Sequence, residues 1–308
     1  MTPLYDERMT PEPETLINSK KGATRGPRPS PVSRFAPSPT GRLHEGHAFS
    51  ALVAHELSAG AGGAFRLRIE DLDQGRSRAE FVEGIYEDLE WLGQEWAEPV
   101  LVQSERSGVY QEALRELLAM GVAYPCFCTR RDIAAAGAAP HGPDGPLYPG
   151  TCRDLGREGT ARAEGEAHAI RLDAAAAATL TGPLAFADKG RSVKVDPELL
   201  GDVVLARKDA AAAYHLAATL DDAAQDVTLI VRGEDLLPST HVHRVLQALL
   251  GLRAPSYHHH RLLLGPDGER LSKRNGARPL ADLRAAGISA EDLASRLRSL
   301  AAEDRAAN

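Results

Sequence analysis

The feature that most restricts the fold of this chain is an alternation of short strand-like runs and helical patterns that begins at Val32. "VSRFAP" reads as a strand and "AFSALVAHELSAG" as a helix, after which "AFRLRIE" alternates apolar and basic residues and "RAEFVEGIYEDLEWLG" is again helical. We expect Gly60 to end the first helix and Ser77 to cap the second. The order strand, helix, strand, helix predicts an α/β protein with a parallel sheet.

This alternation is interrupted in the middle of the chain. A third helix is expected over Gly108–Met120, followed by a stretch so dense in Gly and Pro that no regular structure is expected there. Ala-rich residues 153–200 contain the short strand-like pieces "HAIRLD" and "PLAFAD". The parallel pattern is then expected to resume with "VVLARKD" and "VTLIVRGED" as strands, "HVHRVLQALLGL" as a helix and "YHHHRLLL" as a strand. The sequence therefore predicts a parallel sheet that is split by an inserted subdomain.

These patterns divide the chain into five segments. They are a disordered tail (1–31), the first half of the sheet domain (32–125), the insertion (126–200), the second half (201–265), and a loop with two C-terminal helices (266–308). The tail is polar and proline-rich, without the apolar core of a signal peptide, and no apolar run approaches the roughly 20 residues of a membrane helix. We therefore expect a cytoplasmic protein without a membrane partner. The net charge of −7 argues against a protein that coats nucleic acid through a basic surface.

The stretch "RFAPSPTGRLHEGH" joins the first expected strand to the first expected helix. A proline-rich turn that enters a helix presents free backbone N–H groups and the positive end of the helix dipole, which together form an anion site. Gly41 and Gly46 let a ligand approach the backbone closely, and His44 and His47 can both point toward it. The stretch predicts a phosphate site, and a loop with merely solvated histidines is the alternative.

A second stretch, "GERLSKRNGA", places Lys273 and Arg274 on a Gly-flanked loop after the last expected strand. Lysine is scarce in this chain, since only six of its 36 basic residues are lysines. A mobile lysine loop suits a reaction in which negative charge grows on a polyphosphate.

Together, "HEGH" and "RLSKR" resemble the two signature motifs of class I aminoacyl-tRNA synthetases. "RFAPSPTGRLHEGH", "RIEDLD" and "IVRGEDLL" are similar to the glutamyl branch of that family, from Arg34 to about Ala277. The resemblance implies a Rossmann-type, doubly wound catalytic domain that makes an aminoacyl-adenylate from Mg²⁺-ATP. It further implies that ATP is bound by His44, Gly46, His47, Ser272 and Lys273, of which His44, His47 and Lys273 are catalytic. The two imidazoles would hold the triphosphate, the glycine would admit the adenine ring, and the lysine would steady the departing pyrophosphate.

Two departures from the family pattern bear on activity. Glu45 places a carboxylate inside the first motif, and Arg270 and Leu271 replace the usual first two residues of the second. Neither departure replaces His44 or Lys273, so we expect the chain to be active.

The resemblance also suggests an amino-acid pocket. Glutamate has two carboxylates and one ammonium, so its pocket needs cations or donors and one anionic group. Arg34, Ser38 and Arg232 can supply the former and Glu70 the latter. The matching glutamate-binding positions of the family are Arg34, Phe35, Ala36, Pro37, Ser38, Glu70, Tyr214 and Arg232. The alternatives are a surface ion pair of Glu70 with Arg68 and a rim cation at Arg232.

The three cysteines, Cys126, Cys128 and Cys152, form an odd and clustered set, which favours a metal site over a disulfide. A structural zinc takes four ligands, and from the residues alone His141 or an aspartate is the preferred fourth. The glutamyl-Q branch of the family resembles this C-x-C, Y-x3-C pattern and implies Tyr148 instead. One structural Zn²⁺ is therefore expected, with three buried or free thiols as the alternative.

Only 35 residues follow Lys273, fewer than an added domain of roughly 50 residues needs. This favours the glutamyl-Q branch, which attaches glutamate to queuosine in the anticodon loop of tRNA(Asp). The expected partners are therefore L-glutamate, ATP and queuosine-containing tRNA(Asp), bound by a monomer. Two alternatives are a short glutamyl-tRNA synthetase that charges a tRNA 3′ end, and an inactive zinc-bearing RNA-binding paralogue, which only Glu45 favours.

Overall fold

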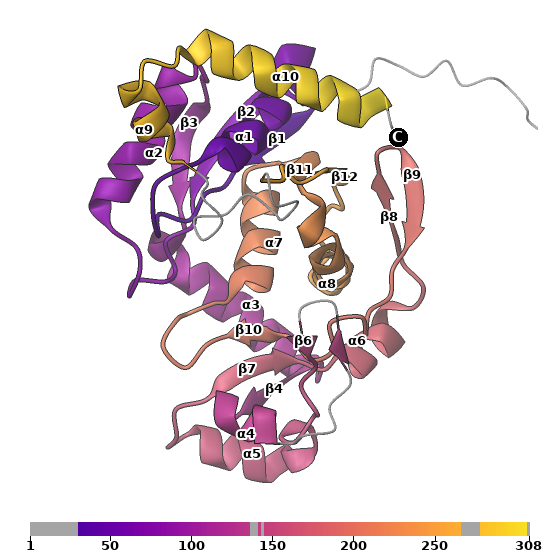
Figure 1. Cartoon of the computed structure of the whole chain (residues 1–308). Coiled ribbons are helices and arrows are strands. Elements are labelled where there is room, and N and C mark those ends of the chain that lie inside the picture. The colour runs from indigo at the N-terminus through magenta and orange to yellow at the C-terminus, as the bar shows by residue number, and fades with distance from the viewer. Residues whose placement is uncertain (1–29, 136–140, 143–144, 266–277, 307–308) are drawn as a thin grey trace, which may run out of the picture.

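The structure, a computed structural model, describes residues 30–135, 141–142, 145–265 and 278–306. Of residues 130, 134, 135, 141, 142, 145 and 146 it describes the backbone alone. The expected tail lies almost wholly outside these ranges. The described chain has a larger part built around parallel strands and a smaller part built around antiparallel strands, at the top and bottom of Figure 1 respectively.

The larger part confirms the predicted parallel sheet. One sheet has the order β1-β2-β3, with all pairs parallel: β1 (Val32–Phe35), β2 (Ala64–Ile69) and β3 (Ala97–Val102). The other has the order β11-β12-β8-β9: β11 (Leu229–Gly233), β12 (Ser256–His260), β8 (Ala185–Asp188) and β9 (Arg191–Lys194). The amide of Thr228 donates to the carbonyl of Val32 at 2.9 Å, which joins β1 to β11. The resulting order β3-β2-β1-β11-β12 is that of a doubly wound Rossmann sheet.

Helices cover both faces of this sheet, as β11 shows. Ile230 packs into a core with α7 and α8, whereas its neighbour Val231 packs on the opposite face into a core with α1, α9 and α10. The α-helices of this part are α1 (Glu45–Leu57), α2 (Ala79–Trp91), α3 (Ser107–Ala119), α6 (Ala174–Thr181), α7 (Tyr214–Ala224), α8 (Leu237–Leu249), α9 (Leu280–Ala285) and α10 (Ala290–Ala306). Short 3₁₀ turns are η1 (Ala59–Ala61), η2 (Gln103–Arg106), η3 (Arg153–Leu155) and η4 (Glu234–Leu236).

Two predicted helix boundaries are wrong. α1 ends at Leu57, and Gly60 lies in the following 3₁₀ turn. α2 begins at Ala79 with Arg78 at its N-cap position, and the buried Ser77 hydroxyl has no hydrogen-bond partner among the described residues. Ser77 stands one residue too early in the chain to occupy the N-cap position from which a hydroxyl accepts the free amides of a helix.

The smaller part is an antiparallel sheet of order β10-β7-β4: β10 (Val204–Ala206), β7 (Ala169–Leu172) and β4 (Ala123–Cys126). It also contains α4 (Arg130–Ala135), α5 (Gly156–Ala163), β5 (His141–Gly142) and β6 (Gly145–Pro146). Regular structure therefore exists where Gly and Pro predicted none. "VVLARKD" pairs with β7 instead of resuming the parallel sheet, and "PLAFAD", as β8, joins β12 of the parallel sheet. Sequence periodicity identifies a strand but not the strand with which it pairs.

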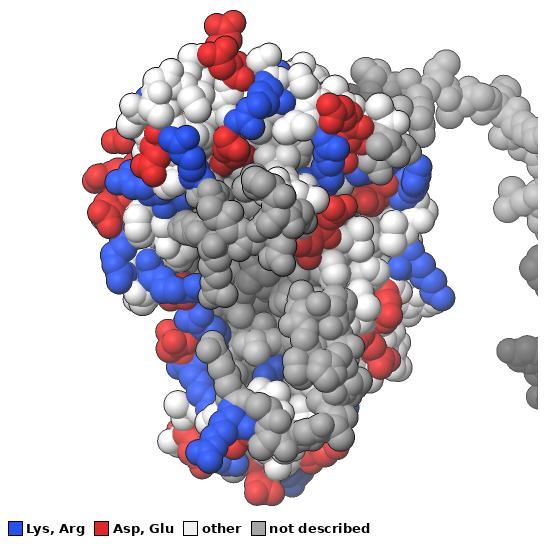
Figure 2. Space-filling view, in the orientation of Figure 1, with Lys and Arg blue, Asp and Glu red and all other residues white. Residues whose placement is uncertain are grey.

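The C-terminal helices confirm the prediction, and α10 lies across α1 at the top of Figure 1. Leu293, Leu297 and Ala301 bury its inner face. Within the described ranges no helix is both long enough and apolar enough to span a bilayer. Figure 2 shows basic and acidic side chains interspersed over the described part of one face, as expected for a chain that does not bind nucleic acid through a uniform basic surface.

Candidate active site

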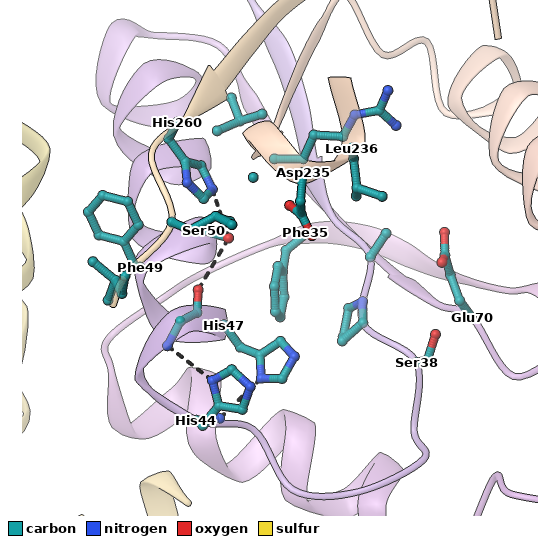
Figure 3. Close-up of a pocket in the computed structure, with 18 of the residues that line it drawn as sticks. Phe35, Ser38, His44, His47, Phe49, Ser50, Glu70, Asp235, Leu236 and His260 are labelled. Atoms are coloured by element: carbon teal, nitrogen blue, oxygen red, sulfur yellow. Dashed lines mark hydrogen bonds between the residues drawn. The ribbon is translucent and has the colours of Figure 1, made fainter. Parts of the chain in front are cut away.

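A cavity of about 720 Å³ opens at the carboxyl ends of β1, β2, β11 and β12, the edge at which α/β proteins bind ligands (Figure 3). It brings together residues from distant parts of the sequence. All the described residues that the sequence assigned to glutamate and ATP line it: Arg34, Phe35, Ala36, Pro37, Ser38, His44, Gly46, His47, Glu70, Tyr214 and Arg232.

Both signature histidines cap the start of α1. The amide of Gly46 donates to Nδ1 of His44, and the amide of His44 donates to Nδ1 of His47, each at 3.1 Å. Two amides that the sequence predicted to be free are therefore occupied. Because Nδ1 accepts in each ring, the proton lies on Nε2, so each imidazole is an uncharged N–H donor. The two rings lie side by side with centroids 3.9 Å apart.

The structure gives Gly46 a role that differs from the one the resemblance implies. A Cβ atom at this position would lie 3.1 Å from Cε1 of His44, tighter than most packed contacts. A larger residue would therefore displace the imidazole that caps α1. Space for an adenine ring at Gly46 stays a prediction.

Ser272 and Lys273, together with the departures Arg270 and Leu271, lie in 266–277, outside the described residues. Both flanks of that segment lie at the cavity. Leu262 and Leu263 line it on one side. On the other, Pro279 forms a β-bridge with His44, and the amide of Leu280 donates to the carbonyl of Leu43 at 2.9 Å. The described residues on both flanks of 266–277 therefore lie at the cavity, with Pro279 beside His44.

Glu45 points away from the site. Its carboxylate accepts from Arg296 of α10 at 2.6 Å, and it is not among the residues that line the cavity. The carboxylate inside the first motif therefore faces the C-terminal helix, and the feature that favoured an inactive paralogue has a structural explanation.

The amino-acid end of the cavity contains a buried ion-pair network. Asp222 Oδ1 accepts from Nε of Arg34 at 2.8 Å and from Nη1 of Arg68 at 2.7 Å. Burial alone would raise the pKa of Asp222, but the two guanidiniums outweigh burial and lower it. Arg68 also donates to Oε1 of Glu70 at 3.1 Å. The ion pair that was the alternative interpretation of Glu70 therefore exists, but it is buried and lies at the cavity.

Burial raises the pKa of Glu70 despite the opposing effects of Arg68 and Arg34. An ammonium bound beside this carboxylate would offset that cost. Arg232 is 5% exposed and donates from Nη1 to the Tyr214 hydroxyl at 3.1 Å. Arg34, Arg68, Asp222 and Glu70 thus form the ion-pair network, and Arg232 lies at the same cavity outside it.

Several residues at the cavity were missed. Asp222 supports Arg34 from behind, and Asp235, Leu236 and His260 line the cavity itself. His260 contacts the hydroxyl of Ser50 at 2.8 Å, which ties β12 to the first turns of α1 (Figure 3). Asp235 and Leu236 lie at or just beyond the carboxyl end of an expected strand, a signal that could have indicated them. His260 lies inside the expected strand "YHHHRLLL", whereas the observed β12 ends at this residue. No local pattern distinguishes Asp222, which lies inside a helix.

The three cysteines converge in the smaller part of the molecule. Their Sγ atoms lie within 4.8 Å of one another, with Cys128 and Cys152 3.6 Å apart. The Tyr148 hydroxyl lies 3.3 Å from Cys126 Sγ and 3.5 Å from Cys128 Sγ. Arg171 donates to Cys126 Sγ at 3.3 Å and lies over the Tyr148 ring.

These separations fit a tetrahedral zinc site, in which Zn–S bonds of about 2.3 Å place sulfurs a little under 4 Å apart. The arginine adds positive charge that stabilises thiolates. The alternative ligand, His141, lies outside the residues whose side chains are described. The arrangement suggests a metal site without identifying the metal.

The protein has the catalytic fold of the class I aminoacyl-tRNA synthetases: a doubly wound sheet with paired histidines at the first helix and an acid–arginine pocket at the same edge. It is a ligase of that class. The chain belongs to the family described as "tRNA synthetases class I (E and Q), catalytic domain", which matches residues 32–306.

Relatives in this family fall into two groups. A "Glutamyl-Q tRNA(Asp) synthetase" of Rhodobacter capsulatus is 48% identical over 85% of this chain and 98% of its own length. A "Glutamate--tRNA ligase 2" of Acidithiobacillus ferrooxidans is 41% identical over 85% of this chain but 56% of its own length. A crystal structure of a glutamate tRNA ligase from Elizabethkingia meningosepticum in complex with its amino acid is 30% identical, with a TM-score of 0.63 over 80% of this chain and 52% of that one. The chain thus spans about half the length of these glutamate–tRNA ligases.

Proposed function

We propose that the protein activates L-glutamate with Mg²⁺-ATP to glutamyl-adenylate and transfers the glutamyl group to queuosine in the anticodon loop of tRNA(Asp). The observation that carries the proposal is the single cavity that holds both an acid–arginine pocket and the paired histidines of α1. The first relative, which shares 98% of its length with this chain, bears the name of that activity.

At the amino-acid end, Arg232 binds one carboxylate of glutamate. Arg34 and Ser38 contribute donors for the other, and Glu70 accepts from the ammonium. The Tyr214 hydroxyl accepts from Arg232, and its proton is available to the ligand. Burial raises the pKa of Tyr214, so the phenol stays protonated and acts as a donor.

At the nucleotide end, the Nε2–H groups of His44 and His47 donate to the triphosphate without placing a fixed charge there. Lys273 and Ser272, which lie outside the described residues, supply a cation and a hydroxyl to the triphosphate. The α-carboxylate of glutamate attacks the α-phosphorus, the bond to pyrophosphate breaks, and Lys273 balances charge on the leaving group. The second step forms an ester between a queuosine hydroxyl and the acyl carbon and releases AMP.

The proposal also includes one structural zinc, bound by Cys126, Cys128, Tyr148 and Cys152. The support is the convergence of these four donor atoms, two from the end of β4 and the residues just after it and two from the segment 148–152. Bound zinc would cross-link a small core of five buried residues that has little apolar area of its own. Metal analysis of protein purified without chelators should give one zinc per chain, and a content near zero would contradict the site.

The activation step is tested by pyrophosphate exchange. We expect glutamate-dependent exchange without tRNA, because the described cavity already contains both ends of the site. Exchange that requires tRNA would favour an ordinary glutamyl-tRNA synthetase, and no exchange under either condition would favour an inactive paralogue. We propose that the reaction takes place in the cytoplasm. We also propose that the protein is a monomer, which a sedimentation measurement would check.

The acceptor is tested by transfer of labelled glutamate. We expect labelling of tRNA(Asp) that contains queuosine and none of the same tRNA with guanosine at that position. The glutamate–tRNA ligases among the relatives favour a second candidate, charging of the 3′ end. Enzymatic removal of the 3′ adenosine separates the two, since label that disappears with this adenosine would establish 3′ charging.

A further inference from the structure

All of the hydrogen-bond partners of Arg232 in the described structure are uncharged. Nη2 donates to the Thr240 hydroxyl at 2.7 Å and Nε to Nε2 of His259 at 3.3 Å. Nη1 donates to the Tyr214 hydroxyl at 3.1 Å and faces Nδ1 of His243 at 3.4 Å. A guanidinium has donors only, so each of these neighbours must accept from it.

His259 is fixed in the form that can accept. Arg232 and His259 are register partners on the parallel strands β11 and β12, so their side chains lie on the same face. On the far side of the ring, Asp188 Oδ1 lies 3.0 Å from Nδ1 and also accepts from the backbone amide of His259 at 3.1 Å. The carboxylate holds the proton on Nδ1 and leaves Nε2 as the acceptor toward Arg232.

His243 accepts for a related reason. Its Nδ1 faces the guanidinium, so its proton lies on Nε2, which is 3.3 Å from Nδ1 of His215. Burial, followed by the charge of Arg232, lowers the pKa of both imidazoles, that of His215 to about 4 and that of His243 well below its usual value. Both rings are neutral at physiological pH. Arg232 therefore donates a hydrogen bond to His243, and His243 donates one to His215.

We propose that Thr240, His243 and His259 form a neutral shell that positions Arg232 and leaves its charge uncompensated, so that the pocket selects glutamate over glutamine. This inference rests on the proposed function. The three residues of the neutral shell act through Arg232 and are positioning residues. Asp188 and His215 support the shell by fixing the two imidazole tautomers.

The neighbouring arginines show what the neutral shell avoids. Arg34 and Arg68 share the carboxylate of Asp222, and Arg68 also pairs with Glu70, so two carboxylates already offset the charges of these two arginines. Arg232 is equally buried, at 5% exposed, but has no carboxylate partner among the described residues. A carboxylate ligand gains the full charge interaction there, whereas an amide of the same shape does not.

The first test compares two isosteric replacements, His243→Asn and His243→Asp. Both place an oxygen near the position of Nδ1, and they differ in charge alone. In pyrophosphate exchange we expect His243→Asp to raise the KM for glutamate at least tenfold above that of His243→Asn. The KM for ATP should agree between the two variants within twofold, and the preference for glutamate over glutamine should fall at least tenfold in His243→Asp.

The outcomes separate this inference from the proposed function. Absence of glutamate-dependent exchange in the wild-type protein would overturn the proposed function and the inference with it. Exchange by the wild-type protein, with equal glutamate KM values for the two His243 variants, would overturn the inference alone.

A second pair keeps the test decisive if a carboxylate at position 243 prevents folding. Thr240→Val removes the hydroxyl that accepts from Nη2 and keeps the shape, while Thr240→Ser keeps the hydroxyl. We expect Thr240→Val to raise the glutamate KM five- to twentyfold without changing the ATP KM, and Thr240→Ser to restore most of the affinity. Equal KM values for Val and Ser, or parallel changes for glutamate and ATP, would overturn the neutral shell.

Discussion

The two ends of the cavity are built in different ways. The amino-acid end is a buried set of charged and aromatic side chains from β1, β2, α7 and β11, with each guanidinium held by several partners in the described structure. The nucleotide end is formed by the backbone and uncharged imidazoles at the start of α1. Its proposed cation, Lys273, lies in the segment between Gly265 and Arg278. The first end is therefore preorganised for binding, and the second supplies charge where it develops during reaction.

This difference predicts that substitutions at the two ends change different kinetic constants. Changes at the amino-acid end should appear mainly in the KM for glutamate. Changes in the cations of the nucleotide end should appear mainly in kcat, because those contacts strengthen in the transition state.

The largest effect is expected for Lys273→Ala. Loss of a cation that balances charge on departing pyrophosphate should lower kcat for exchange by about 10²–10³-fold. The KM for glutamate should change less than threefold, because the amino-acid end is complete without this residue. Steady-state exchange at varied glutamate checks both values. A large rise in KM with kcat preserved would place Lys273 in ground-state binding and remove the proposed contrast between the two ends.

Arg232→Ala and Arg34→Ala should differ in their effects on stability, although both residues lie at the amino-acid end. Arg34→Ala leaves the buried Asp222 with Arg68 as its remaining guanidinium partner, so we expect it to lower the free energy of unfolding by about 2 kcal/mol in addition to raising the glutamate KM. Arg232→Ala strands no carboxylate, so it should cost less stability while raising the glutamate KM about 100-fold, with the ATP KM unchanged. Urea unfolding and exchange kinetics on both variants check this. Similar stability losses would show that Arg232 has a charged partner after all.

The sequence predicted the residues that line the cavity better than the residues that hold those side chains in position. Arg34 lies near the carboxyl end of a strand and His44 caps the start of a helix, so local pattern and family resemblance place them together at one edge. Asp222, Thr240 and Asp188 could not be predicted, because each contacts its arginine or histidine through tertiary packing between elements far apart in sequence. The partner of β10 was predicted wrongly for the same reason, since periodicity carries no information about register between distant strands.

A smaller effect is expected from pH, and His215 contributes to it at the amino-acid end. The pKa of His215 is about 4 in the folded protein because of burial and the charge of Arg232, against about 6.5 when unfolded. Below pH 6.5 the unfolded chain therefore binds a proton that the folded chain refuses, so stability falls as the pH decreases toward 4.

Between pH 8 and 5, His215 should account for a loss of about 2 kcal/mol in the free energy of unfolding. His215→Asn removes the titration and keeps an acceptor for His243. The measurement is urea unfolding at both pH values, and the variant should lose about 2 kcal/mol less than the wild-type protein. Equal losses would show that His215 is not held neutral by its surroundings.

The smallest effect is expected for Glu45→Ala, although Glu45 lies within the signature motif. Its carboxylate pairs with Arg296, whose side chain is 51% exposed, and a solvent-exposed pair contributes about 0.2–1 kcal/mol. A carboxylate in the first turn of α1 adds a similar amount by interacting with the helix dipole. The double-mutant cycle with Arg296→Ala separates these contributions, because the dipole interaction persists in the Arg296→Ala background. Since Glu45 does not line the cavity, we expect kcat and the KM values for glutamate and ATP to stay within twofold of wild type. A rise of more than threefold in the ATP KM would show that the nucleotide end includes this carboxylate.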